Sequence, residues 1–389
     1  MAPTEPFPPM PDPTGPRRPA APWAPPAPLL LAGQIDRLRG GGHPAAADVE
    51  ALVTGVLTGD IDLDTFGEWL VALADVGETN AEISGVAAAL RSRMVRVPHT
   101  LPVVADTCGT GGDGSGSFNI SSAAAIVVAG AGLPVAKHGN RAVSSRTGSA
   151  DVLERLGVRV DGPPSLAAAC LADLGLAFCF APTHHPAMAR VGPLRRALGR
   201  PTVFNLVGPL CNPAGATVQV IGVGRSAVRH AMAEAAIRGG ARRVLIVSSS
   251  LATEAPHGPA TGSATLDEVS LFGITDVIDV GPEGTRELRW SPEDFGLATR
   301  PVAELARLEV SGPDESAAAI RAVLAGESGP RRDVVVLNAA ATLWAAGLAA
   351  SLPAARALAE RAIDDGSAAA KLAALAARSN APVAPSVDA

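Results

Sequence analysis

The amino-acid sequence predicts an α/β protein, in which a large domain has a mostly parallel sheet flanked by helices and a small domain is entirely helical. Two observations support this fold class. Between Leu29 and about Val97, apolar residues recur at the spacing of amphipathic helices. After Pro98, short Val-rich runs alternate with Ala-rich helical segments. Because strands joined by crossover helices run parallel, the second part predicts a largely parallel sheet.

The N-terminal part divides into an arm and a helical domain. Residues 1–28 consist mainly of Pro, with Ala and a few charges, so we expect a disordered and partly extended arm. Residues 29–97 form the predicted helical domain. Within it, Thr79 followed by Glu82 fits a capping box at the start of a helix.

Residues 98–378 form the predicted α/β domain, and residues 379–389 are expected to be a disordered tail. The clearest strands are the Val-rich runs at 101–105, 133–136 and 243–247. Plausible crossover helices cover 123–131, 149–156 and 164–174. The end of the domain is predicted to be helical at 315–325, 333–346 and 353–377.

The composition indicates a soluble, cytoplasmic protein with reduced thiols. The 389 residues are 47% hydrophobic, but Gly, Pro or charged residues interrupt the apolar runs before they reach the length of a membrane span. The N-terminus lacks the pattern of a secretory signal. The 4 cysteines include no CxxC pair, and a formal net charge of -6 argues against broad nucleic-acid binding. We therefore expect neither a membrane nor a nucleic-acid partner.

A glycine-rich segment, Asp106–Ser122, follows a predicted strand and runs directly into an Ala-rich helix. Its glycines leave main-chain N–H groups uncovered, and the helix that starts near Asn119 adds the positive end of its dipole. Ser117, Ser121 and Ser122 add hydroxyl groups. The spacing matches neither the P-loop pattern GxxxxGK[ST] nor the dinucleotide pattern GxGxxG. The segment therefore predicts a phosphate-binding surface of another class.

A second loop with basic residues follows the next predicted strand. This loop, Lys137–Ser145, supplies the ammonium group of Lys137, the guanidinium group of Arg141 and two serine hydroxyls. The carboxyl ends of parallel strands are where ligands bind in open α/β sheets. The two loops together therefore predict a diphosphate-binding site.

Six motifs resemble those of the anthranilate phosphoribosyltransferase family in their order and spacing. They are Gly-Thr-Gly-Gly-Asp (109–113), Asn-Ile-Ser-Ser (119–122), Lys-His-Gly-Asn-Arg (137–141), His-Pro-Ala-Met (185–188), Thr-Val-Phe-Asn-Leu (202–206) and Gly-Pro-Leu-Cys-Asn-Pro (208–213). The resemblance covers roughly Leu29 to Ala377. It implies that a helical insertion near residues 184–207 joins the small domain and that the protein forms a homodimer through this domain.

The resemblance also implies which residues contact the two substrates. Those expected at 5-phosphoribosyl 1-diphosphate are Gly109, Gly112, Asp113, Ser117, Asn119, Ile120, Ser121, Ser122, Lys137, His138, Gly139, Asn140, Arg141, Ala142, Val143, Ser144, Ser145 and Ser149. Gly109 and Asn140 are expected near anthranilate, and Arg195 is expected to bind its carboxylate. A guanidinium group suits this role because it donates two parallel hydrogen bonds.

Magnesium is the expected cofactor, and the resemblance assigns Ser121, Asp267 and Glu268 as its ligands. Hard oxygen ligands suit Mg²⁺, which often shares a substrate diphosphate. Because adjacent residues of a strand point to opposite faces, we expect Asp267 and Glu268 to lie in a loop. This sequence departs from the family pattern here, since Ala264-Thr-Leu-Asp-Glu stands where Gly-Leu-Asp-Glu is usual.

The reaction implied by the resemblance is the second step of tryptophan biosynthesis from chorismate. The amino group of anthranilate attacks the anomeric carbon of the ribose while diphosphate leaves, and we assign no residue as a general base. Two alternatives remain open at this point. One is an enzyme similar to pyrimidine nucleoside phosphorylases, and the other is a non-catalytic relative that binds nucleic acid.

Overall fold

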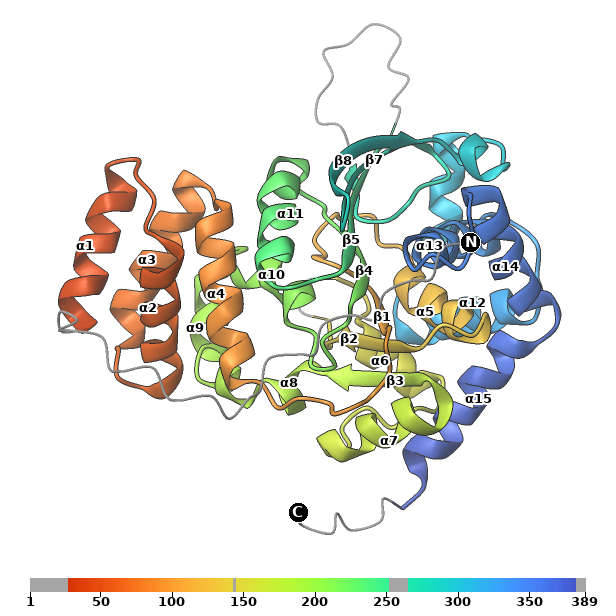
Figure 1. Ribbon diagram of the computed structural model, residues 1–389, viewed down its shortest axis with the longest axis horizontal. Coiled ribbons are helices and arrows are strands. Elements are labelled where there is room, and N and C mark those ends of the chain that lie inside the picture. The colour runs from red at the N-terminus through yellow and green to blue at the C-terminus, as the bar shows by residue number, and fades with distance from the viewer. Residues whose placement is uncertain (1–26, 143–144, 252–264, 383–389) are drawn as a thin grey trace, which may run out of the picture.

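The computed structural model describes residues 27–142, 145–251 and 265–382, which form a helical domain beside a larger α/β domain (Figure 1). Most of the predicted arm and of the predicted tail lies outside these residues. The arm was predicted to extend to residue 28, but helix α1 already begins at Ala27. The tail was predicted to begin at residue 379, but helix α15 continues to Asn380. Ser379 in α15 is buried, and its Oγ accepts a hydrogen bond from Arg159 N at 3.0 Å. This contact holds the end of the helix against the domain.

The helical domain consists of four N-terminal helices and a later insertion. The N-terminal helices are α1 (Ala27–Arg39), α2 (Ala46–Thr58), α3 (Leu63–Val76) and α4 (Asn80–Arg93). The insertion contains α8 (Ala181–His184), η1 (Pro186–Ala189), α9 (Gly192–Leu198), α10 (Phe204–Val207) and η2 (Gly208–Cys211). Helix α9 packs against α3, and α10 packs against α4. The predicted helical domain with an insertion is thus confirmed, although its first helix begins at Ala27 instead of residue 29. Its limit at residue 97 stays a prediction.

Local sequence signals explain how this domain forms. The predicted capping box is confirmed, since Thr79 N donates to Glu82 Oε2 at 2.9 Å and Thr79 Oγ1 accepts from Ala81 N at 3.3 Å. In the core, the ring of Phe66 meets that of Phe204 edge-on, with centroids 6.2 Å apart. The insertion is therefore buried in the same core as α3.

The α/β domain is built on one sheet of eight strands. These are β1 (Ala105–Gly109), β2 (Val135–Gly139), β3 (Leu176–Phe180), β4 (Val218–Gly222), β5 (Arg243–Leu251), β6 (Thr265–Leu266), β7 (Gly273–Gly281) and β8 (Gly284–Trp290). The order is β3-β2-β1-β4-β5-β7-β8, and β6 pairs with β5. The neighbouring strands β3, β2, β1, β4 and β5 run parallel to one another. Strands β6 and β7 pair antiparallel with β5, and β8 pairs antiparallel with β7. The predicted mostly parallel sheet is confirmed.

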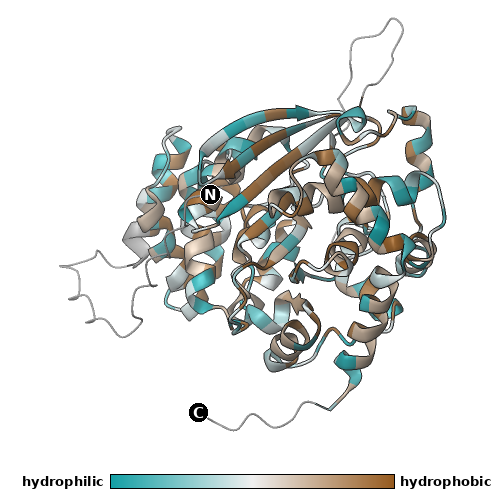
Figure 2. Cartoon of the chain, turned by 45° about the vertical axis from the view of Figure 1, so that its right-hand side comes forward, coloured by the Kyte–Doolittle hydropathy of each residue, from teal (hydrophilic) through white to brown (hydrophobic). Residues whose placement is uncertain are grey.

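Helices cover both faces of the sheet. On one face lie α5 (Ile120–Gly130), α13 (Pro330–Ala345), α14 (Leu352–Asp364) and α15 (Ser367–Asn380), and on the other lies α11 (Arg229–Arg238). The remaining helices are α6 (Ser149–Arg155), α7 (Pro164–Leu174), η3 (Ser226–Val228), η4 (Pro292–Phe295), η5 (Val302–Leu308) and α12 (Pro313–Leu324). Figure 2 shows hydrophobic residues along the central strands and the helix faces that cover them. No helix among the described residues combines the length and apolar character needed to cross a bilayer.

Two predicted boundaries in this domain are wrong for identifiable reasons. The first strand was predicted at 101–105 but begins at Ala105, because Pro102 lacks the N–H group that a strand donates. The strand continues beyond the prediction and includes the buried polar residue Asp106. The helix predicted at 353–377 is two helices, α14 and α15. Gly366, at φ +79°, lies between them in the left-handed region, which interrupts the helix.

A buried carboxylate links the sheet to helix α13. Asp279 on β7 accepts two hydrogen bonds from Arg243 at 3.0 Å each and one from Arg286 at 2.6 Å. The guanidinium carbon of Arg243 lies 4.2 Å from the centre of the Trp344 ring. Burial would raise the pKa of Asp279, but the hydrogen bonds and charges of Arg243 and Arg286 hold it below its ordinary value. The carboxylate therefore remains charged and stabilises the fold.

We predict that Asp279→Ala lowers the free energy of unfolding by about 2–4 kcal/mol, because Arg243 loses its carboxylate. Because the pKa of Asp279 is lowered in the folded state, its contribution is present above the unfolded pKa of about 3.9 and is lost as the pH falls through the folded value. Urea unfolding followed by circular dichroism at neutral and acidic pH measures both effects. Asp161→Ala, which removes an exposed partner of Arg159, is the control. Equal losses in both variants would contradict the prediction.

Candidate active site

Three neighbouring strands end in glycine at the same edge of the sheet. Strand β1 is parallel to both β2 and β4, and Gly109 lies opposite Gly222 in the register. Strand β2 ends at Gly139. The glycine-rich segment follows β1 and the second loop follows β2, so the two predicted phosphate-binding segments leave the sheet side by side.

The glycine-rich segment is an open loop whose turns are fixed by its own polar groups. Gly111 and Gly112 have φ angles of 69° and 81°, which side chains other than hydrogen disfavour. Asp113 Oδ1 accepts hydrogen bonds from both N and Oγ of Ser115 at 3.1 Å. Ser115 Oγ also lies within hydrogen-bond distance of Ser117 Oγ, at 3.1 Å, where the Ser117 hydroxyl can donate. A loop of this kind presents main-chain N–H groups that suit phosphate oxygens.

Helix α5 begins within the last residues of this segment, at Ile120. Asn119 is the residue before the helix, and its side-chain oxygen accepts hydrogen bonds from Thr147 Oγ1 at 3.0 Å and Ser316 Oγ at 2.8 Å. Ile120 is buried in the core, so only its main chain is available to a ligand. The Oγ of Ser122 is buried without a hydrogen-bond partner in the described part of the chain. The first turn therefore places the positive end of the helix dipole at this point, while its N–H groups donate within the protein, those of Ile120 and Ser122 to Phe118 O and Asn119 O.

Lys137 lies beneath the start of α5. Its side chain is buried, and Nζ donates to Thr107 O at 2.6 Å and to Ser121 Oγ at 3.3 Å. The ammonium group thus lies beside a hydroxyl that we predict to bind both phosphate and metal. A positive charge held at this point favours anions above the helix start.

His138 and His185 form a neutral pair between β2 and the helical insertion. Their ring centroids are 5.1 Å apart. Burial lowers the pKa of His138 to about 3 and that of His185 to about 4. Imidazoles with such low pKa values bind protons weakly, so neither ring is suited to act as a general base at neutral pH.

The second loop holds the other predicted phosphoribosyl contacts, of which Val143 and Ser144 lie outside the described residues. The guanidinium group of Arg141 donates to both carboxylate oxygens of Glu154, at 2.7 and 2.6 Å, and to Asp151 at 3.2 Å. Hydrogen bonding to Glu154 and Asp151 raises the pKa of Arg141. Its charge is thereby neutralised within the protein, and a contact between Arg141 and diphosphate stays a prediction.

Asn140 and Ser149 lie together at the base of the second loop. The main-chain oxygen of Asn140 accepts hydrogen bonds from Ala150 N at 3.1 Å and Ser149 Oγ at 3.3 Å. A Cβ atom added to Gly139 would lie 2.0 Å from Ser149 Oγ, so this contact requires glycine. Ser145 Oγ donates to Thr147 O at 3.2 Å near the other end of the loop.

Asp267 and Glu268 lie in a bend directly after β6, as we expected for a pair that acts together. The preceding Ala264, where the sequence departs from the family pattern, lies outside the described residues. Asp267 Oδ2 accepts a hydrogen bond from Gly111 N at 2.9 Å. Glu268 Oε1 accepts one from Ser121 N at 3.1 Å. The pair therefore joins the glycine-rich segment to the start of α5.

Glycines at two strand ends make room for this bend. A Cβ atom on Gly222 would lie 1.6 Å from the main-chain oxygen of Asp267, and one on Gly109 would lie 2.3 Å from its Oδ2. A side chain at Gly222 would overlap the main chain of Asp267, and a side chain at Gly109 would displace its carboxylate. The carboxylates reach the loop because both strands end in glycine.

Three carboxylates crowd together at this place. Asp267 N lies 3.5 Å from Asp113 Oδ2. Desolvation and then the charge of Asp113 raise the pKa of Asp267 to about 7. Desolvation and then the charge of Asp267 raise the pKa of Glu268 well above its ordinary value. Such a cluster attracts a cation, but among the described residues no group of three or more His, Cys, Asp or Glu side chains is arranged to hold a metal ion, so the magnesium site stays a prediction.

Arg195 lies apart from this cluster, on helix α9 of the insertion. Its guanidinium carbon is 5.5 Å from the centre of the Phe204 ring. Burial lowers the pKa of Arg195, and within the described ranges no carboxylate contributes to the shift. A partly desolvated guanidinium of this kind is suited to bind an external carboxylate.

Sequence reasoning missed residues that support the site from outside the motifs. Thr107, Asp151 and Ser316 bond to predicted site residues, and Gly222 admits the Asp267 bend. Only Gly222 has a local signal, because it ends a Val-rich strand as Gly109 ends the neighbouring one. The other contacts depend on tertiary structure.

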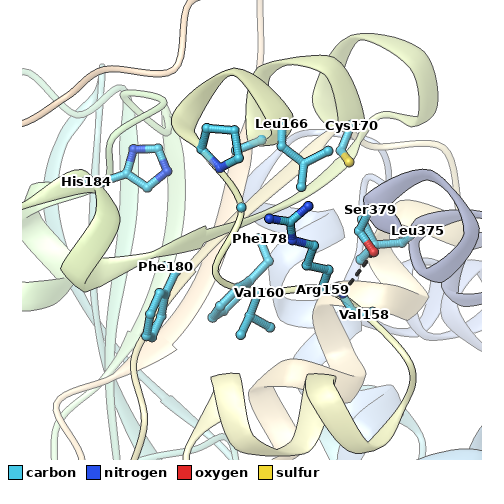
Figure 3. A pocket seen from close by; sticks show the side chains of 13 residues that line it. Val158, Arg159, Val160, Leu166, Cys170, Phe178, Phe180, His184, Leu375 and Ser379 are labelled. Carbon is cyan, nitrogen blue, oxygen red and sulfur yellow. Dashed lines mark hydrogen bonds between the residues drawn. The ribbon is translucent and has the colours of Figure 1, made fainter. Parts of the chain in front are cut away.

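A small cavity lies elsewhere, between β3, α7 and α15 (Figure 3). Its volume is about 20 Å³, and its lining includes Val158, Leu166, Phe178 and Leu375. This volume suits a single water molecule, not a substrate. None of the predicted site residues lines it.

The chain matches two models of protein families that together span most of its length. Residues 34–94 match the helical bundle domain of a glycosyl transferase family, and residues 101–369 match the a/b domain of the same family. An anthranilate phosphoribosyltransferase from Moorella thermoacetica is 44% identical over 348 residues, which are 90% of this chain and 98% of that protein. The chain belongs to the anthranilate phosphoribosyltransferase family. It is therefore a transferase enzyme.

Other members of the family agree in sequence and in fold. The anthranilate phosphoribosyltransferase from Azorhizobium caulinodans is 45% identical, across 86% of this chain and 92% of its own length. The crystal structure from Thermus thermophilus has a TM-score of 0.79 at 39% identity, covering 90% of this chain and 99% of that one. The enzyme from Saccharomyces cerevisiae in complex with PRPP and Mg has a TM-score of 0.77 at 26% identity, covering 90% and 98%.

We predict that Gly222→Ala lowers kcat/KM for phosphoribosyl transfer by on the order of 100-fold, because the added methyl group displaces Asp267 from the glycine-rich segment. Gly222 is not itself a predicted substrate contact, so the variant tests the position of the bend. Steady-state kinetics measure the effect, and a thermal melt checks the fold. Gly33→Ala, where a Cβ atom meets nothing within 4 Å, is the control. Activity at the wild-type level in Gly222→Ala would contradict this account of the bend.

Proposed function

We propose that the chain transfers the phosphoribosyl group of 5-phosphoribosyl 1-diphosphate to the amino group of anthranilate. The products are N-(5-phosphoribosyl)anthranilate and diphosphate, which places the reaction in tryptophan biosynthesis. The observation that carries the proposal is the junction of the glycine-rich segment, the start of α5 and the Asp267–Glu268 bend. A solved relative from Saccharomyces cerevisiae is in complex with PRPP and Mg, and another is in complex with 4-fluoroanthranilate.

The diphosphate would bind where the glycine-rich segment meets α5. The main-chain N–H group of Gly112 and the hydroxyls of the first helical turn can donate to its oxygens. The buried ammonium group of Lys137 adds a fixed positive charge below. Donors that are already in place cost little reorganisation when negative charge develops on the leaving group.

The residues at the bend fit a magnesium ion. Asp267 and Glu268 supply hard oxygen ligands. Burial and the neighbouring carboxylates raise their pKa values, and a bound cation would offset this cost of keeping them charged. Ser121 lies at hydrogen-bond distance from Glu268 through its main-chain N–H group. When bound, Mg²⁺ supplies positive charge that neutralises the departing diphosphate. Within the described residues, Ser121, Asp267 and Glu268 would hold the ion.

Anthranilate would bind between the two domains, with its carboxylate on Arg195. Gly109 and Asn140 would lie near the amino group and the ribose. Because the amine attacks as a neutral group and both His138 and His185 are poor bases, the chain's contribution is positioning and charge stabilisation. The ribose passes through a cation-like state, and the amine captures it with inversion.

Neither alternative function has a comparable observation in its favour. A nucleoside phosphorylase uses free phosphate and has no need of a carboxylate bend beside its phosphate loop. A nucleic-acid-binding role is disfavoured by the net charge of -6. The homodimer stays a prediction implied by the family resemblance, and the cytoplasmic location stays a prediction from the composition and the N-terminal sequence.

Loss of anthranilate fluorescence tests the proposal directly. We expect the purified chain to consume anthranilate only when both 5-phosphoribosyl 1-diphosphate and Mg²⁺ are present, because the departing diphosphate must be neutralised. Parallel reactions with ring-substituted anthranilates define the substrate range. Absence of turnover, together with retention of nucleic acid at physiological salt, would favour the binding alternative.

Arg195→Ala provides the matched variant for this assay. We expect the KM for anthranilate to rise by about tenfold or more, because a charge-assisted pair with the substrate carboxylate is lost. Arg196→Ala, on the exposed side of the same helix, should behave as the wild type. An unchanged KM in Arg195→Ala would show that the carboxylate binds elsewhere.

A further inference from the structure

We propose that Asp151 is a positioning residue for the phosphoribosyl diphosphate site. Its carboxylate holds together the two ends of the loop that joins β2 to α6, residues 140–148, so that Asn140 and Ser149 keep the spacing that the substrate requires. The inference rests on the proposed function of that loop, and Asp151 is not among the residues assigned by the family motifs.

The carboxylate of Asp151 bonds to both ends of the loop at once. Its Oδ2 accepts hydrogen bonds from Ala142 N at 2.9 Å and from Gly148 N at 3.0 Å. Its Oδ1 accepts one from Arg141 Nη1 at 3.2 Å. Both oxygens are therefore occupied by the loop itself, and Asp151 acts on the substrate only through other residues.

The two ends of the loop touch at Gly148. A Cβ atom at this glycine would lie 2.3 Å from Ala142 N and 2.6 Å from Asn140 O. Such close main-chain packing brings two N–H donors together, and a shared acceptor removes their mutual repulsion. Asp151 Oδ2 is that acceptor.

Helix capping alone does not account for this arrangement. A carboxylate at the third position of α6 is expected to accept from Gly148 N, as in a capping box. The additional bond from Ala142 N belongs to the incoming end of the loop, which capping does not require. Asp151 therefore fixes the geometry of the loop as well as the start of the helix.

The hydrogen bonds from Ala142 N and Gly148 N to Asp151 Oδ2, which we call the clamp, also set where the loop lies relative to helix α5. Thr147, next to Gly148, donates through Oγ1 to Asn119 Oδ1 at 3.0 Å. Asn119 precedes the first turn of α5. The loop end that Asp151 holds is thus bonded to the segment that we predict to bind the diphosphate, so a shift of this end would misplace contacts on both segments.

Three variants separate the clamp from charge and from folding. Asp151→Ala removes the acceptor, while Asp151→Asn retains an amide oxygen that can accept from both N–H groups. Glu154→Gln removes the same amount of charge from the surroundings of Arg141 but leaves the clamp intact. Asp151→Ser, which retains an acceptor for the helix start, replaces Asp151→Ala if the latter does not fold.

We expect Asp151→Ala to raise both the KM and the calorimetric Kd for 5-phosphoribosyl 1-diphosphate by about tenfold. The KM for anthranilate and kcat should change by less than about twofold. Asp151→Asn should recover most of the loss, and Glu154→Gln should match the wild type. Binding is titrated in the presence of Mg²⁺, with thermal melts as a check of folding.

The inference is overturned if Asp151→Asn is as defective as Asp151→Ala, because charge would then be the decisive property. It is also overturned if binding is unchanged in Asp151→Ala or Asp151→Ser, or if the KM values of both substrates rise equally. The proposed function fails separately, through absence of turnover in the wild type. In that case, the calorimetric Kd still tests Asp151.

Discussion

The bend that carries Asp267 and Glu268 can lie against the sheet only because two strands end in glycine. At Gly222 a side chain would overlap the main-chain oxygen of Asp267, and at Gly109 it would overlap the carboxylate. The close contact between the bend and the strand ends brings Asp267 beside Asp113. It also brings Glu268 to the start of α5. Desolvation, and then repulsion between these like charges, raises the pKa values of Asp267 and Glu268. The fold therefore maintains a site that a cation would stabilise.

The rest of the site is organised around this junction. The Gly111 N–H group that binds Asp267 belongs to the segment suited to phosphate, and the Ser121 N–H group that binds Glu268 belongs to the first turn of α5. A diphosphate with its metal would thus meet anion donors and cation ligands at one place. Arg195 lies on the helical insertion, so in the proposed function the two substrates would depend on different domains.

Much of this arrangement was predictable where the signal was local. The glycine-rich segment and the capping box at Thr79 depend on neighbouring residues, and both form as the sequence indicates. The continuation of β1 beyond Ala105 was missed because Asp106 is polar yet buried, and its partners Asn212 and His138 are distant in sequence. The guanidinium of Arg141 was expected to face a phosphate, but its acidic partners become neighbours only after α6 forms. Tertiary contacts, which sequence spacing does not encode, account for these differences.

Calorimetric titration of 5-phosphoribosyl 1-diphosphate with and without Mg²⁺ tests the central claim most directly, namely that the carboxylate bend requires a cation to accept the diphosphate. In the wild type, Mg²⁺ should tighten binding by on the order of tenfold or more, because it separates the carboxylates from the anionic ligand. The double variant Asp267→Asn/Glu268→Gln should lose this dependence while retaining its fold. Equal affinity with and without Mg²⁺ in the wild type, or an undiminished effect of Mg²⁺ in the variant, would contradict the account.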